Sequence, residues 1–224
     1  MKNYRWVTIG CGDIAHQFAQ AMRQEGRTLY GVANRTYEKA AAFAEEYGIP
    51  RVYERISDVF TDENVDIVYI ATPHNTHSGY INEALRHGKH VLCEKAITLD
   101  IEELKEAQAL AEERGLVLAE AMTIYHMPLY KRLREIAEGG ALGKLCMIQM
   151  NFGSFKEYDM TNRFFNPDLA GGALWDIGVY ALSFIRWFMS CWPDRIASQV
   201  KYAPSGVDEQ VGILLMNGAD EMAT

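Results

Sequence analysis

Two glycines separated by one residue interrupt a hydrophobic run near the start of the chain, in VTIGCGDIA at positions 7–15. Glycine costs roughly 0.5–1 kcal/mol relative to alanine inside a strand or helix, so this pair marks a turn where the backbone has to be bare. Gly10 suits a tight turn, Gly12 suits close approach of a pyrophosphate, and Ala15 suits packing of the next helix against the strand. The pattern predicts a dinucleotide-binding turn.

The helix expected after this turn begins at Ile14, directly after Asp13, and both residues are candidates for cofactor binding. A phosphate is favoured at such a helix N-terminus because the first N–H groups are free and the helix dipole attracts an anion. The alternative is an ordinary glycine turn with no ligand.

The end of the second expected strand indicates which dinucleotide binds. In NAD-binding domains an acidic residue about 20 residues beyond the glycines accepts the ribose hydroxyls. This chain has Asn34 and Arg35 there, and a guanidinium suits bidentate contact with a phosphate. We therefore expect NADP, with NAD possible. The alternative is that Arg35 is a solvated charge before the next helix.

Lys95, Asp176 and Tyr180 are the candidates for proton transfer. Hydride transfer from an alcohol carbon needs a base for the hydroxyl proton, and the reverse reaction needs an acid. A lysine ammonium close to a tyrosine lowers the pKa of the phenol, so Lys95 and Tyr180 are a candidate pair. Asp176 and Tyr180 are four residues apart and share one face if residues 174–189 are helical. The alternatives are that they form a surface pair, or that Lys95 itself donates the proton.

Strand-like runs alternate with amphipathic helical runs in the first half of the chain. The predicted strands span residues 5–9, 28–33, 67–71, 90–92 and 116–119, and the predicted helices span 14–23, 37–47, 76–87 and 101–114. This alternation is typical of a doubly wound α/β domain with a parallel sheet. We expect a dinucleotide-binding Rossmann domain at residues 1–121.

The pattern changes after residue 121. Helices are predicted at 129–138 and 173–189, and strands at 144–152, 196–202 and 210–216. Because strands now follow one another without helices between them, we expect an α+β substrate domain at 122–224 with an open, mainly antiparallel sheet. The chain ends directly after a strand, in NGADEMAT, and we expect this second domain to be incomplete at its C-terminus.

Composition limits the classes of partner. The 224 residues are 49% hydrophobic and carry a net charge of -8, with 22 Lys and Arg against 30 Asp and Glu. No basic run suits a nucleic-acid backbone, and no apolar stretch reaches the length of a membrane span. We expect a cytoplasmic protein without nucleic-acid or membrane partners. The four cysteines form no CxxC pair, so we expect reduced thiols and no metal, despite the HxxH of His74 and His77.

Two segments resemble the glucose-fructose oxidoreductase and inositol dehydrogenase family, called Gfo/Idh/MocA. They are IVYIATPHNTHSGYINEALRHGKHVLCEKAITLD at 67–100 and AGGALWDIGVYAL at 170–182. Together with the glycine turn they extend the resemblance over essentially the whole chain, and the family's chains run further. Tyr180 stands where most members have histidine. In this respect the chain is similar to the branch that includes dihydrodiol dehydrogenase and NADP-linked xylose dehydrogenase.

The resemblance implies roles for individual residues. Lys95, of the Glu94–Lys95 pair, lies beside the nicotinamide and the substrate oxygen, with Asp176 and Tyr180 on the other side. The ribose and nicotinamide end of the cofactor is lined by four residues, namely Thr72, Pro73, His74 and His77. Two residues depart from the family pattern: His74 replaces an asparagine and Ala96 replaces a proline.

These observations predict an NADP-dependent oxidoreductase, a dehydrogenase that transfers a hydride between the nicotinamide and a sugar, polyol or related small diol or carbonyl. The alternatives are a non-catalytic NADP-binding sensor or regulatory protein, and a structural scaffold. The family also implies a homo-oligomer, a dimer or higher, through the sheet of the second domain. Substrate choice is expected in the loop at 152–168, which offers Phe155, Tyr158, Arg163, Phe164 and Phe165.

Overall fold

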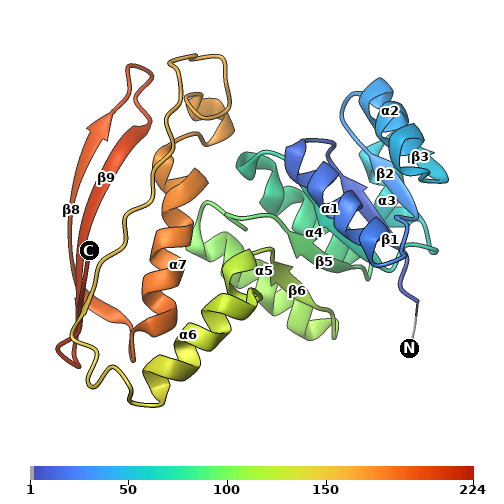
Figure 1. Ribbon diagram of the computed structural model, residues 1–224. Coiled ribbons are helices and arrows are strands. Elements are labelled where there is room, and N and C mark those ends of the chain that lie inside the picture. The colour runs from blue at the N-terminus through green and yellow to red at the C-terminus, as the bar shows by residue number, and fades with distance from the viewer. Residues whose placement is uncertain (1–2) are drawn as a thin grey trace. The chain divides into compact units, whose positions relative to one another are not determined.

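The computed structural model describes residues 3–224, which form two compact units, one up to Ala121 and the other from Met122 to Thr224 (Figure 1). The first unit contains a parallel sheet of six strands in the order β3-β2-β1-β4-β5-β6. Its strands are β1 Trp6–Ile9, β2 Gly31–Ala33, β3 Arg51–Tyr53, β4 Ile67–Ile70, β5 His90–Cys93 and β6 Leu118–Glu120. The predicted doubly wound α/β fold is therefore confirmed.

Five α-helices connect these strands: α1 Asp13–Gln24, α2 Tyr37–Tyr47, α3 Ile56–Thr61, α4 His77–Arg86 and α5 Ile101–Glu113. The sequence pattern did not predict β3 or α3, which are only three and six residues long. Both lie between two predicted elements, where short runs carry little periodicity.

Successive side chains along each strand point to opposite faces of this sheet, so a hydrophobic core forms on each face. In β4, Val68 and Ile70 pack with residues of α3, α4 and α5, whereas Tyr69 packs with residues of α1 and α2. A strand buried on both faces has apolar side chains at consecutive positions, which accounts for the continuous run IVYI. The strand order reverses between β1 and β4, and ligands of such folds bind at this switch point, beyond the carboxyl ends of the strands.

The second unit contains a sheet of four strands in the order β7-β10-β9-β8, with only the β7–β10 pair parallel. Its main elements are α6 Pro128–Glu138, β7 Met147–Ile148, α7 Val179–Phe188, β8 Pro193–Tyr202, β9 Asp208–Asn217 and β10 Met222–Ala223. Figure 1 shows β8 and β9 as a long hairpin beside α7. The predicted mainly antiparallel sheet is confirmed.

The long strand predicted over 144–152 is wrong, because only Met147–Ile148 pairs as a strand. Its partner β10 is two residues long, and the last hydrogen bond of this ladder joins the Met150 N–H to the Thr224 carbonyl at 2.8 Å. A run with strand propensity forms a strand only where its backbone finds a partner.

One segment, Pro167–Phe188, is long and apolar enough to cross a membrane by length and composition alone, which is weak evidence for a span. In the structure a left-handed residue, Ala170, and a glycine at positive φ, Gly172, interrupt this segment before α7. Ile185 of α7 belongs to a core cluster with Leu215 of β9. The expected absence of a membrane span stays a prediction.

Candidate functional site

The glycine turn lies at the carboxyl end of β1. The Gly10 N–H donates to the Ala33 carbonyl at 2.9 Å, and Gly10 has a φ of 105°, a conformation that other residues rarely adopt. A Cβ at Gly10 would lie 2.3 Å from the Ala71 carbonyl oxygen. Glycine is therefore required here by the backbone of the neighbouring strand as well as by the turn.

Gly12 is the N-cap of α1, and no side chain caps this helix end. An added Cβ at Gly12 would meet open space, so a bulky group is free to approach the backbone there. The first helical residues, Asp13 and Ile14, present their N–H groups at this end, and Ala15 is fully buried against the sheet. This combination fits a pyrophosphate at the start of α1.

Asn34 and Arg35 follow the carboxyl end of β2. The Asn34 side chain donates to the Thr36 carbonyl at 3.0 Å and so shapes the turn into α2. Arg35 is exposed. An exposed guanidinium one strand away from the glycine turn is available to a phosphate.

The loop after β4 contains Thr72, Pro73, His74 and His77. The Thr72 and Thr76 hydroxyls are 2.7 Å apart, and the Thr76 hydroxyl also donates to the Pro73 carbonyl at 2.7 Å. The buried His74 ring contacts the His77 ring edge-on at 5.7 Å between centroids.

His77 is fully buried and bridges two loops. Its Nδ1 lies 2.8 Å from the Ala96 carbonyl oxygen and its Nε2 lies 2.9 Å from the Thr72 carbonyl oxygen. Burial lowers the pKa of His77, and the hydrogen bonds to the backbone oppose this effect only in part. The imidazole therefore ties the loop after β4 to the loop that contains Lys95.

Glu94 and Lys95 follow β5 at the same carboxyl edge. The Tyr69 hydroxyl donates to Glu94 Oε1 at 2.5 Å, and the Glu94 N–H donates to the Ile70 carbonyl at 2.9 Å. Burial raises the pKa of Glu94, against the hydrogen bond from Tyr69 and the charge of Lys95. The peptide bond between Lys95 and the buried Ala96 is cis.

The predicted cofactor residues thus gather at one edge of the first unit. They lie after four strands: Gly10, Gly12, Asp13, Ile14 and Ala15 after β1, Asn34 and Arg35 after β2, Thr72, Pro73, His74 and His77 after β4, and Glu94 and Lys95 after β5. Glu120, at the end of β6, lies at this edge too. No motif pointed to Glu120, and only its position at the end of a parallel strand identifies it.

In the second unit, Asp176 and Tyr180 lie where a π-helical turn, Leu174–Gly178, continues into α7. The predicted helix at 173–189 is therefore present, with a wider first turn of a kind that is frequent at functional sites. Arg163 donates to Asp176 at 3.3 Å. The Tyr180 ring meets the Phe152 ring edge-on, with 6.0 Å between centroids.

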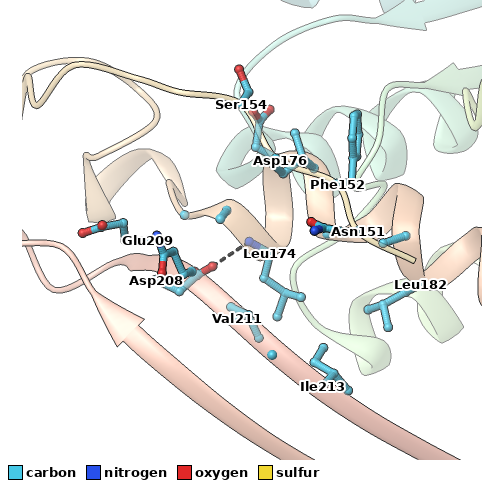
Figure 2. A pocket seen from close by; sticks show the side chains of 18 of the residues that line it. Asn151, Phe152, Ser154, Leu174, Asp176, Leu182, Asp208, Glu209, Val211 and Ile213 are labelled. Carbon is cyan, nitrogen blue, oxygen red and sulfur yellow. Dashed lines mark hydrogen bonds between the residues drawn. The ribbon is translucent and has the colours of Figure 1, made fainter. Parts of the chain in front are cut away.

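Two glycines and an aspartate fix this helix start. A Cβ at Gly171 would lie 2.7 Å from the Arg163 and Phe164 carbonyl oxygens, and one at Gly172 would lie 2.1 Å from the Asp208 carboxylate. That carboxylate accepts the Leu174 N–H at 2.6 Å (Figure 2). Asp208, at the start of β9, thus caps the turn that carries Asp176, and sequence reasoning did not single it out.

A cavity of about 1240 Å³ lies within the second unit. Its apolar side is formed by Leu174 and Leu182 and by Val211 and Ile213 of β9, which point toward one another in Figure 2. Polar lining comes from Asp176, Asp208, Asn151 and Ser154. Apolar walls with a few polar groups are typical of small-molecule sites.

Among residues 3–224 no group of three or more His, Cys, Asp or Glu could hold a metal ion. The four cysteines are unpaired, with Cys93 buried and Cys11 half-buried in the glycine turn. Burial raises the pKa of the Cys11 thiol to about 11, against the charge of Lys39.

Two family models match the chain. One, described as an oxidoreductase family with an NAD-binding Rossmann fold, matches residues 4–122, and the other, the GFO/IDH/MocA C-terminal domain, matches residues 130–224. Trans-1,2-dihydrobenzene-1,2-diol dehydrogenase from Sus scrofa is 34% identical over 215 residues, with 94% of this chain and 64% of that protein covered. The enzyme of the same name from Homo sapiens is 32% identical at the same coverage. The chain thus spans about 64% of the length of these curated relatives.

A 3-ketoreductase from Actinomadura kijaniata, solved in complex with NADP and TDP-benzene, has a similar structure. Its TM-score is 0.89 at 28% identity, with 99% of this chain and 69% of that chain covered. The fold of both units, the two family models and these relatives agree with one another. The chain belongs to the Gfo/Idh/MocA family of oxidoreductases.

Proposed function

We propose that this protein is an NADP-dependent oxidoreductase that transfers a hydride between the nicotinamide and a sugar, a polyol or a related small diol or carbonyl. The observation that carries the proposal is that the glycine turn, Arg35 and Lys95 lie at one carboxyl edge of a parallel sheet. The relatives named as diol dehydrogenases and the ketoreductase with bound NADP support this reading over a non-catalytic sensor.

The first unit fits the cofactor. Gly12 and the first turn of α1 would hold the pyrophosphate, Arg35 the 2′-phosphate, and Thr72 and Pro73 the ribose and nicotinamide end. His74 and His77 would support that end from inside the loop. The bound cofactor supplies or accepts the hydride.

Three residues of the chain would handle the substrate. Tyr180 donates the proton to the carbonyl oxygen during reduction, Lys95 favours its phenolate and orients the substrate oxygen, and Asp176 binds a substrate hydroxyl. The alternative is that Lys95 itself donates the proton and Tyr180 only packs. The assignment of Tyr180 as the acid accounts for the glycine-constrained turn that holds Asp176 and Tyr180 on one helix.

The experiment is turnover of NADPH and of NADH with a panel of aldoses and dicarbonyls, together with oxidation of trans-dihydrodiols by NADP. We expect turnover with at least one class of substrate and its loss in Lys95→Ala. NADPH binding without turnover on any substrate would instead favour the sensor.

We further propose a cytoplasmic protein that forms a homo-oligomer through the sheet of the second unit. Support comes from exposed apolar side chains on that sheet, with Ile196 67% and Tyr202 64% exposed. Large apolar groups on a sheet surface mark interaction sites.

A further inference from the structure

Glu120 is a half-buried carboxylate at the carboxyl edge of the first unit that the proposed reaction does not use. In the parallel register of β5 and β6 it lies opposite Cys93, and the next N–H, from Ala121, donates to the Cys93 carbonyl at 2.7 Å. The end of β6 is thus fixed directly beside the chain that continues into Glu94 and Lys95. Glu120 cannot shift relative to this loop without breaking the ladder.

The Glu120 side chain also binds the far side of the same loop. Its Oε1 accepts the Ile97 N–H at 2.9 Å. Lys95 therefore lies between two fixed points of the loop. On one side, Tyr69 binds Glu94. On the other side, His77 contacts Ala96 and Glu120 binds Ile97.

Electrostatics connect Glu120 to Lys95 itself. Burial raises the pKa of Glu120, and the charge of Lys95 acts in the opposite direction. The charge of Lys95 also lowers the pKa of Glu94, whereas the charge of Glu120 raises it. The charge of Lys95 thus acts on two carboxylates in a partly buried site, where charges interact more strongly than in water.

We propose that Glu120 is a positioning residue for Lys95, whose loop it holds through its hydrogen bond to Ile97 and whose ammonium it orients through its negative charge. The inference rests on the proposed function only because that function assigns Lys95 a role in catalysis. The coupling of the two charges is a property of the first unit and is measurable without substrate.

Glu120→Gln separates charge from hydrogen bonding, because the amide oxygen still accepts the Ile97 N–H while the charge is lost. Glu120→Ala removes both, and Glu120→Asp keeps the charge. Glu113→Gln, at an exposed position of α5, is the control for an equal change in net charge. Each variant of the 224-residue chain is labelled with limiting acetic anhydride at pH 8, and the modification of Lys95 is read by peptide mass spectrometry against exposed lysines.

We expect Lys95 to react roughly three- to tenfold faster in Glu120→Gln than in the wild type, since without the nearby anion the side chain is no longer held in place and is more accessible to the reagent. Glu120→Asp should restore most of the wild-type rate, and Glu113→Gln should match the wild type. A wild-type labelling rate in Glu120→Gln overturns the proposal, because the hydrogen bond alone then accounts for Glu120.

A turnover assay distinguishes failure of the proposed role of Glu120 from failure of the proposed function. If the wild type turns over substrate, Glu120→Gln should lower kcat and shift its pH profile, with little change in the Kd of NADPH. If no variant turns over any substrate but the labelling difference is present, the coupling holds and the proposed function fails. If Glu120→Gln does not fold, Glu120→Asp, which keeps the charge, is compared with Glu120→Ala, which lacks both the charge and the hydrogen bond, and equal Lys95 labelling in both overturns the proposal.

Discussion

We expect individual polar side chains to decide the proposed cofactor choice and proton transfer. Arg35 is exposed at the end of β2, where the turn shaped by Asn34 leaves its guanidinium accessible. Tyr180 and Asp176 lie on a single helix whose start is fixed by backbone and by Asp208. Single substitutions at these positions should therefore change binding or rate without removing the fold.

Arg35→Asp should weaken NADPH binding much more than NADH binding. The lost charge-assisted contact to the 2′-phosphate is worth about 1.5–3 kcal/mol, or roughly ten- to a hundredfold in Kd. Titration of NADPH and NADH fluorescence measures both constants. Arg27→Asp, in the loop before β2 at the opposite end of that strand, is the control. Equal losses for both cofactors in Arg35→Asp would contradict the assignment.

Tyr180→Phe should lower kcat by about 10²–10⁴-fold, the usual contribution of a positioned acid, with the Kd of NADPH nearly unchanged. Lys95→Ala should lower kcat at least as much. The pH dependence of kcat should lose one titration step in Tyr180→Phe. A wild-type rate and profile in this variant would make Lys95 the acid.

At the scale of elements, side-chain hydrogen bonds connect loops and helix ends from distant parts of the sequence. His77, at the start of α4, connects the loop after β4 with the loop after β5. Asp208, at the start of β9, caps the π-helical turn before α7. Asp208 accepts the Leu174 N–H, and the one N–H of the neutral His77 ring donates to a loop carbonyl; a backbone group left unpaired costs roughly 1–3 kcal/mol.

His77 should make stability depend on pH. Burial lowers its pKa in the folded state below the ordinary value of 6.5. Below pH 6.5 the unfolded chain therefore binds a proton that the folded chain does not, so stability is fully present above this pH and is lost as pH falls toward the lowered pKa. Urea unfolding at pH 7.5 and 5.5 should show a larger loss for the wild type than for His77→Gln. The exposed His87→Gln should keep the wild-type dependence.

Asp208→Ala should reduce the free energy of unfolding of the second unit by about 1–3 kcal/mol, because the Leu174 N–H loses its acceptor. Denaturant unfolding followed by tryptophan fluorescence measures the change. Asp194→Ala, exposed on β8, should stay within about 0.5 kcal/mol of the wild type. Equal stability of the two variants would mean that Asp208 does not cap the turn.

At the scale of the whole molecule, each unit has its own hydrophobic core, and the sheet of the second unit leaves the strand β8 almost entirely exposed. A long exposed edge strand with apolar side chains favours association with another chain. The proposed homo-oligomer follows from this surface.

Ile196→Lys should shift the protein toward the monomer, since a charge at the centre of an apolar contact opposes its burial. Light scattering over a range of protein concentrations measures the oligomeric state. Glu54→Gln, at an exposed position of the first unit, changes the net charge by the same one unit and is the control. A monomeric wild type at all concentrations would remove the proposal.

The local sequence pattern was enough to predict most elements of the first unit that lie at the proposed cofactor site. Runs such as 67–71 are apolar at successive positions because both faces of a parallel strand are buried, and helix 37–47 was predicted with the bounds that the structure has. The glycine turn was predictable because Gly10 has to adopt a positive φ, and that requirement shows in its residue type. The motifs around Lys95 and Tyr180 likewise indicated the family.

Pairing and contacts between distant segments were decided only by the tertiary structure. The predicted strand at 144–152 is two residues long because backbone hydrogen bonds need a partner that no local pattern specifies. Glu120 binds Ile97 from 23 residues away and Asp208 binds Leu174 from 34 residues away. An isolated carboxylate in a sequence carries no information about which N–H or ammonium it will meet, because folding alone brings those groups within hydrogen-bond distance.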